Sequence, residues 1–161
     1  MKARPTTDFA KEGLFNVLHN RIDWEETEAL DLFSGTGSIA LELVSRGCPR
    51  VVSVEMNNLH WRFICKAKET LGAEELLPLK ADVFKFLSTC NQQFDLIFAD
   101  PPYDLAGIDT LPDIIFGKKL LKTDGILLLE HSRKYDFSTF PFFKEERKYG
   151  NVHFSFFTQE A

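Results

Sequence analysis

Five short apolar segments, separated by amphipathic ones, restrict what this chain of 161 residues can fold into. Their apolar residues run nearly without interruption instead of alternating with polar ones, which is typical of strands covered on both faces. The segments are EALDLF at 28–33, RVVSVE at 50–55, LLPLKA at 76–81, FDLIFA at 94–99 and GILLLEH at 125–131. The pattern predicts an α/β fold, with a mostly parallel sheet between two layers of helices.

The segments between these strands have the marks of helices, which we expect over residues 6–20, 37–47, about 58–71 and about 106–119. Thr6 or Thr7 can cap the first of them. One face of the third collects Leu59, Phe63, Ile64 and Ala67. The closing PFFKEERKYGNVHFSFF indicates two strands joined at Tyr149-Gly150-Asn151, an antiparallel hairpin. We expect one domain over residues 1–161.

The composition argues against several classes of protein. Hydrophobic residues make up 44% and charged residues 27%, as in an ordinary globular domain, and no apolar run approaches the ~18–20 residues of a membrane span. The start lacks the layout of a signal peptide. The three cysteines lack any CxxC pairing and the four histidines lack metal-ligand spacing, so we expect a cytoplasmic protein with no metal and no membrane partner.

Two glycines, Gly35 and Gly37, lie in DLFSGTGSIA between a predicted strand and a predicted helix. Glycine permits a positive φ and lets a ligand approach the backbone, and the following helix offers free N–H groups to an anionic ligand. The spacing of Gly35, Gly37 and Ala40 also satisfies the loose dinucleotide fingerprint GxGxxA. A tight turn before a helix is the alternative interpretation.

Acidic residues end the strands around this loop. Glu55 ends the next strand, 18 positions after Gly37, where an acid can accept both hydroxyls of a ribose. Asp82 follows the third strand, where it can accept from the exocyclic amine of a base, cap the following helix, or do both. Asp31 can meet a ligand's ammonium or brace the loop. Three acids without a lysine or arginine in the loop suit the positive charges of S-adenosylmethionine better than a pyrophosphate.

The segment Asp100-Pro101-Pro102-Tyr103 follows the fourth strand, across the switch point from the glycine loop, where such sheets bind ligands. A residue before proline is pushed towards extended geometry, and each proline fixes φ and donates no N–H. Asp100 and the Pro101 carbonyl can therefore act as adjacent acceptors for an exocyclic amine, while Tyr103 stacks on the base that bears it. The alternative is a purely structural turn.

Together DLFSGTG, Glu55, Asp82 and DPPY resemble the motifs of class I S-adenosylmethionine-dependent methyltransferases that modify exocyclic amines of nucleic acids. The opening RPTTDFAKEGLFNVL and the size of the chain narrow this resemblance to the RsmD-type guanine-N2 methyltransferases of small-subunit ribosomal RNA. The likeness runs from Arg4 to the closing KYGNVHFSFF. It implies a Rossmann-like sheet of seven strands with an antiparallel C-terminal strand.

The resemblance also implies roles for single residues. The catalytic bracket on the target guanine would consist of Asp100, Pro101, Pro102 and Tyr103. The cofactor S-adenosylmethionine would contact Asp31, Phe33, Gly35, Gly37, Glu55, Met56, Asp82 and Val83. The RPTTD segment would lie over the cofactor or contact RNA, through Arg4, Thr6 and Thr7, with Tyr103 also on the substrate.

One departure from the family concerns RNA affinity. Members usually have a basic hairpin similar to RIIGGKYKGR before RPTTD, and this sequence starts almost at that motif. The formal net charge is −5, whereas affinity for naked RNA rests largely on neutralised phosphates. We therefore expect a monomer that acts on small-subunit ribosomal RNA in a partly assembled subunit. The contacts are expected from basic residues near the strand ends, namely Arg4, Lys118, Lys119 and Arg133.

Three other functions fit part of the pattern. An adenine-N6 methyltransferase on DNA or RNA would grip its amine with the same bracket, although no stretch supplies a separate target-recognition region. A nicotinamide-dependent dehydrogenase fits GxGxxA, but it leaves DPPY unexplained and lacks an evident catalytic Tyr/Lys or His pair. A catalytically inactive RNA-binding or scaffold protein would have no need of the acids.

Overall fold

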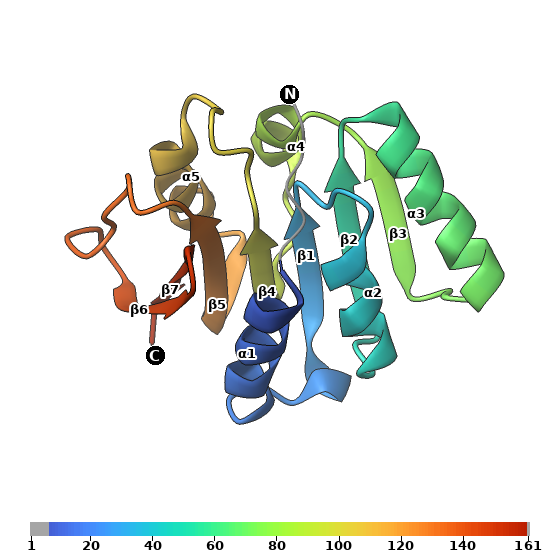
Figure 1. Ribbon diagram of the computed structural model, residues 1–161, viewed down its shortest axis with the longest axis horizontal. Helices are drawn as coiled ribbons and strands as arrows, with labels where there is room; N and C mark the ends of the chain where they lie inside the picture. Colours follow the sequence, from blue (N-terminus) through green and yellow to red (C-terminus); the bar gives the residue numbers. More distant parts are fainter. Residues whose placement is uncertain (1–6, 161) are drawn as a thin grey trace.

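The strands lie side by side in one sheet with helices on both faces in a computed structural model, which describes residues 7–160 (Figure 1). Their order across the sheet is β3-β2-β1-β4-β5-β7-β6. β1 to β5 pair in parallel, whereas β7 is antiparallel to both β5 and β6. The strands are β1 (Glu28–Leu32), β2 (Arg50–Glu55), β3 (Leu76–Lys80), β4 (Phe94–Ala99), β5 (Leu121–His131), β6 (Phe143–Tyr149) and β7 (Val152–Thr158). The expected fold class is confirmed.

The helices form two layers, each with its own apolar core. α1 (Asp8–His19), α2 (Ser38–Ser45) and α3 (Asn58–Leu71) cover one face, where Leu14, Leu43 and Ile64 are buried. α4 (Val83–Thr89) and α5 (Leu111–Gly117) cover the other, where Leu87 and Ile115 are buried. Two short 3-10 turns, Trp24–Glu26 and Ile108–Thr110, precede β1 and α5. Within residues 7–160, no helix combines the length and apolarity that crossing a membrane requires.

Two element boundaries differ from expectation. The helix expected over about 106–119 is a 3-10 turn followed by the seven-residue α5. β5 begins at Leu121 instead of Gly125, and its pairing with β4 shifts register between Phe94 and Leu96. A Cβ on Gly125 would lie 2.8 Å from the carbonyl oxygen of Lys122, so this irregular segment folds back too tightly for a side chain.

The prediction that Leu59, Phe63, Ile64 and Ala67 share one apolar face of α3 is wrong in part. Ile64 is fully buried, but Leu59 is 73% exposed and Phe63 is 57% exposed. α3 lies over β2 and β3 at the edge of the sheet (Figure 1), so only a narrow stripe of the helix meets the core. On the β3 side, polar groups of Trp61 and Lys68 donate to carbonyls of that edge, at Pro78 and Leu76. Leu59 and Phe63 lie outside this stripe because the helix turns about 100° per residue.

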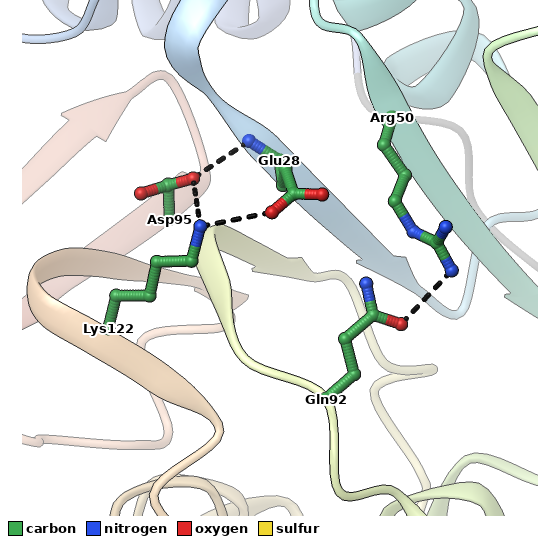
Figure 2. A network of polar contacts seen from close by, with 5 residues as sticks. All are labelled: Glu28, Arg50, Gln92, Asp95 and Lys122. Carbon is green, nitrogen blue, oxygen red and sulfur yellow. Dashed lines mark hydrogen bonds and ion pairs between the residues drawn. The ribbon is translucent and has the colours of Figure 1, made fainter.

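Polar side chains tie the amino ends of the strands together (Figure 2). Lys122 of β5 lies 3.0 Å from Glu28 Oε1 and 3.2 Å from Asp95 Oδ2, and the same Asp95 oxygen accepts from the backbone N–H of Glu28 at 2.9 Å. Arg50 and Gln92 form a second bond nearby, at 3.2 Å. These contacts connect the starts of β1, β4 and β5, and they give Lys122 a structural role.

α1 packs against the C-terminal hairpin through a glycine. A Cβ on Gly13 would overlap with Tyr149 Cε1, so the tyrosine ring occupies the space that a side chain would need. The ring is held by edge-on contacts with Phe9 and Phe154, at centroid distances of 5.9 and 6.0 Å. Helix propensity alone would favour alanine at this position.

We therefore expect Gly13→Ala to destabilise the protein by about 1–3 kcal/mol, as overpacking does, although alanine is the better helix former. Urea denaturation measures this change. Gly117→Ala in α5 is the matched control, because nothing lies within 4 Å of its added Cβ, and it should be neutral or slightly stabilising. If Gly13→Ala remained destabilising by the same amount in a Tyr149→Ala background, the tyrosine would not be the cause.

Candidate functional site

The glycine loop between β1 and α2 has an unusual backbone. Phe33, Gly35 and Gly37 all have left-handed φ angles, of 60°, 58° and 85°. Gly37 forms the amino cap of α2, and a Cβ there would lie 3.0 Å from Ile64 Cγ1, so α3 approaches this glycine closely. Nothing lies within 4 Å of a Cβ built on Gly35, which leaves open space on that side of the loop. The loop therefore combines a tight inner side with an open outer side.

Glu55 is fixed beside this loop by backbone donors. Its Oε1 accepts from the N–H of Gly35 at 2.7 Å, and its Oε2 accepts from the N–H of Asn57 at 2.8 Å. The Nδ1 of His60 lies 4.0 Å from Oε2. The expected position of Glu55 beside the loop is confirmed, while its contact with a ribose stays a prediction.

Asp31 lies inside the protein, at 1% exposure. Its Oδ2 accepts from the Ser34 hydroxyl at 2.6 Å, and Ser34 Oγ accepts in turn from the Ser53 hydroxyl at 2.7 Å. Burial raises the pKa of Asp31 to about 7, against the opposing effect of hydrogen bonds from Ser34 and the backbone of Ala40. Of the two roles considered for Asp31, bracing the loop is the one that these contacts describe.

Asp82 and its neighbours lie at the ends of β2 and β3. Asp82 Oδ1 accepts from the N–H of Lys85 at 3.1 Å, so the aspartate caps α4 as expected. Val83, the first residue of α4, is 4% exposed, and Met56, which follows Glu55, is 60% exposed. The contacts of these three residues with an adenine remain predictions.

The bracket Asp100-Pro101-Pro102-Tyr103 begins as a continuation of β4 beside β1. The N–H of Asp100 donates to the Leu32 carbonyl at 3.4 Å, one residue before the glycine loop starts. The Pro102 carbonyl accepts from the N–H of Leu105 at 3.0 Å and so forms a turn. No hydrogen bond within residues 7–160 engages the carbonyl of the buried Pro101. The two predicted motifs therefore lie at adjacent strand ends, as the switch-point argument requires.

Sequence reasoning missed one carboxylate at this edge, that of Glu130. Ala99 of β4 is aligned with Leu129 of β5, which places the next residues, Asp100 and Glu130, level with each other. Phe98 and Leu128 belong to the core that α1, α2 and α3 cover. Asp100 and Glu130 each come two residues later, and because side chains alternate along a strand, they lie on that same face of the sheet. Glu130 is 3% exposed. An acid after a continuous apolar strand is the signal that identified Glu55, and ILLLE contains it too.

The basic residues expected to contact RNA do not gather at one edge. Lys118 donates to the carbonyls of Leu87 and Ser88, at 2.7 and 2.6 Å, and Lys119 follows it before the amino end of β5. These two lysines lie at the edge opposite the bracket, and their contact with RNA stays a prediction. Arg133 follows the carboxyl end of β5, on the bracket's edge. A cleft of about 690 Å³ lined by Phe116, Phe142 and others also lies at the opposite edge.

Of the RPTTD segment, Arg4 and Thr6 lie outside the described residues. Thr7 caps α1, since its Oγ1 accepts from the N–H of Ala10 at 3.2 Å. Its contact with cofactor or RNA stays a prediction.

The buried Asp31 should make stability depend on pH. A carboxyl whose pKa rises from 3.8 unfolded to about 7 folded stabilises the protein while protonated, and this contribution is lost as pH rises through 7. Asn is neutral throughout, so in Asp31→Asn the fall in unfolding free energy between pH 4 and 7 should shrink, by up to about 4 kcal/mol. Urea denaturation across this range tests it, with the exposed Asp109→Asn as control. Equal pH profiles for Asp31→Asn and wild type would contradict the assignment.

Comparison with known proteins places this site in a family. Ribosomal RNA small subunit methyltransferase D of Escherichia coli (strain K12) is 26% identical over 161 residues, which cover 98% of this chain and 80% of that protein. The solved structure of a conserved hypothetical protein of Streptococcus pyogenes has a TM-score of 0.80 at 26% identity, over 92% of this chain and 94% of that one.

A third similar structure is that of the Thermus thermophilus 16S rRNA N2 G1207 methyltransferase (RsmC), in complex with AdoMet and guanosine. It has a TM-score of 0.74 at 24% identity, over 96% of this chain and 44% of that one, and so supports the fold. The model of the family described as conserved hypothetical protein 95 matches residues 1–158. The chain therefore belongs to this family, that of the RsmD-type methyltransferases to which its motifs pointed.

Proposed function

We propose that this protein is an S-adenosylmethionine-dependent methyltransferase that modifies the exocyclic N2 amine of a guanine in small-subunit ribosomal RNA. The observation that carries the proposal is the hydrogen bond from Asp100 to Leu32, which fixes the acceptor bracket beside the glycine loop. The relative in Escherichia coli is named for small-subunit ribosomal RNA, and the Thermus thermophilus structure holds AdoMet and guanosine. These names support the substrate class and the cofactor.

The residues around the loop fit S-adenosylmethionine. The open space beside Gly35 suits a ligand that approaches the backbone, and Glu55 lies at its border with both oxygens oriented by backbone donors. Glu55 would hold the ribose, Met56, Asp82 and Val83 the adenine, and the loop from Phe33 to Gly37 the methionyl part, with Asp31 bracing the loop from inside. When bound, the cofactor supplies a methyl group on a sulfonium, electrophilic enough that no covalent enzyme intermediate is needed.

The bracket acts on the amine, which is a poor nucleophile because its lone pair is delocalised into the base. Asp100 and the Pro101 carbonyl accept from its two N–H groups, which favours a more tetrahedral nitrogen and stabilises its developing positive charge. Tyr103 stacks on the base, and this positioning supplies up to ~7–11 kcal/mol of the barrier reduction in well-oriented cases. The proton leaves to Asp100 or to water. The base must first leave its stack, at a cost of a few kcal/mol.

The net charge of the chain bears on the form in which the RNA substrate is recognised. With a net charge of −5, the chain suits a substrate recognised by its folded shape better than a loose strand, so we propose a partly assembled small subunit in the cytosol as the substrate. We propose that one domain over residues 1–161 acts as a monomer, with Arg4, Thr6 and Thr7 near the cofactor or the RNA.

Glu55 and Asp100 should separate cofactor binding from transfer. Glu55→Ala should weaken S-adenosylmethionine by about 1.5–3 kcal/mol, the value of charge-assisted hydrogen bonds. Asp100→Ala should keep cofactor affinity within a few-fold and abolish methyl transfer. Calorimetry and single-turnover assays measure both, with the exposed Glu74→Ala as control. Near-normal turnover by Asp100→Ala would refute the bracket mechanism.

The product identifies the base. We expect N2-methylguanosine after incubation with partly assembled small subunits, a slower reaction on protein-free RNA and none on DNA. Nucleoside mass spectrometry of each digest measures this. Equal rates on naked and assembled RNA would show that a partly assembled subunit is not required. N6-methyladenine as the product would identify the protein as the alternative adenine-N6 methyltransferase.

A further inference from the structure

We propose that the outward face of α3, formed by Leu59, Arg62, Phe63 and Lys66, binds the RNA substrate; this inference rests on the function proposed above. Leu59 and Phe63 are 73% and 57% exposed and stand one helical turn apart, so their side chains are neighbours. Single exposed apolar residues need no explanation, but a large aliphatic and an aromatic side chain side by side form a patch.

Two cations flank this patch. Arg62 and Lys66 are both exposed, one turn apart, on the same side of the helix as Leu59 and Phe63. Among the described residues neither forms an ion pair. Lys68, by contrast, donates to the Leu76 carbonyl and serves the packing of α3 on β3. Two positive charges one turn apart disfavour the helix slightly, and they line one surface hollow together with Cys65, Glu69 and Thr70.

The helix that carries this face adjoins the candidate site. α3 begins three residues after Glu55, at the carboxyl edge of the sheet (Figure 1). Ile64, on the inward side of α3, approaches Gly37 of the loop so closely that a Cβ there would lie 3.0 Å away, and the four residues lie on the outward side of the same helix. An RNA segment whose target base enters the bracket passes this edge of the molecule, and α3 offers it a surface there.

RNA is the occupant that these side chains fit. Arg62 and Lys66 suit phosphates, and Phe63 suits the flat side of an unpaired base, which RNA-binding proteins recognise by stacking. A base that leaves its stack to be methylated exposes its neighbours to such contacts. A second copy of this chain is disfavoured, because a symmetric contact would bring the same patch with its two cations against itself.

The test measures RNA affinity without turnover. The protein bears Asp100→Ala, and the probe is a transcript of small-subunit ribosomal RNA, titrated by filter binding at several salt concentrations. Adding Arg62→Glu and Lys66→Glu should raise the RNA Kd at least about tenfold and lower the salt slope by roughly two phosphate contacts. Adding Phe63→Ser should raise the Kd several-fold and leave the salt slope unchanged.

Matched controls distinguish this face from general effects. Lys144→Glu with Lys148→Glu makes the same charge change on exposed residues of β6, at the far edge of the sheet, and Leu71→Ser removes another exposed apolar side chain from α3. Both should leave the RNA Kd within about twofold of the parent protein. Every variant should bind S-adenosylmethionine as the parent does, which also verifies its fold.

The outcomes separate the two proposals. Unchanged RNA affinity in both α3 variants, or equal losses in the controls, would overturn the RNA-binding face. So would a dimer that Phe63→Ser dissociates while RNA affinity stays intact, because the face would then belong to a second copy. If the wild type transferred no methyl group to RNA while the α3 variants still lost affinity, the proposed function would fail and the face would stand as an RNA-binding surface.

Discussion

The parallel pairing of β1 with both of its neighbours is the constraint on which this architecture depends. Leu32, the last residue of β1, is aligned with Val54 of β2 and Ala99 of β4. The residues one step further along the chain therefore arrive at the same level of the sheet. Continuing the register outwards yields one row of five positions, namely Lys80, Glu55, Phe33, Asp100 and Glu130. Glu55 and Asp100 lie level with the start of the glycine loop because backbone hydrogen bonds set their position along the strands.

The glycine loop depends on polar groups that lie on both sides of it. Its left-handed residues are unfavourable for any side chain, and Phe33 is not a glycine. From outside, Glu55 accepts from Gly35, and from inside, Asp31 accepts from Ser34, which is tied in turn to Ser53 of β2. Each acid therefore fixes the loop, a role that was one of the two expected for Asp31 and was not expected for Glu55. Burying a carboxylate as deeply as Asp31 lowers the stability of the protein. In return, the hydrogen bonds that Asp31 accepts hold the glycine loop in its conformation.

The strands and the glycine and proline motifs could be predicted from sequence because their signals are local. A continuous apolar run identifies a covered strand wherever it occurs, and it located β2 and β4 to the residue. The direction in which individual side chains point was harder to predict from the sequence. Whether Asp31 faces a ligand or the interior depends on where Ser34 and Ser53 fall, and the placement of Leu59 and Phe63 depends on how narrow a stripe of α3 meets the sheet edge. Lys118 and Lys119 precede β5 in the chain and therefore lie at its amino end, opposite the bracket, as their order in the sequence already indicates.

The contact between Gly13 and Tyr149 has a consequence for how the protein forms during translation. α1 is synthesised first, but its partners in β6 and β7 emerge from the ribosome last, and Arg21 beyond α1 also pairs with Glu145 of β6. A nascent chain therefore lacks the β6 and β7 part of the surface against which α1 packs until these strands are made, whereas the contacts of Lys11 with Ser38 and Glu42 of α2 are available earlier. The packing of α1, whose amino end Thr7 caps, is therefore complete only once the C-terminal hairpin has been made.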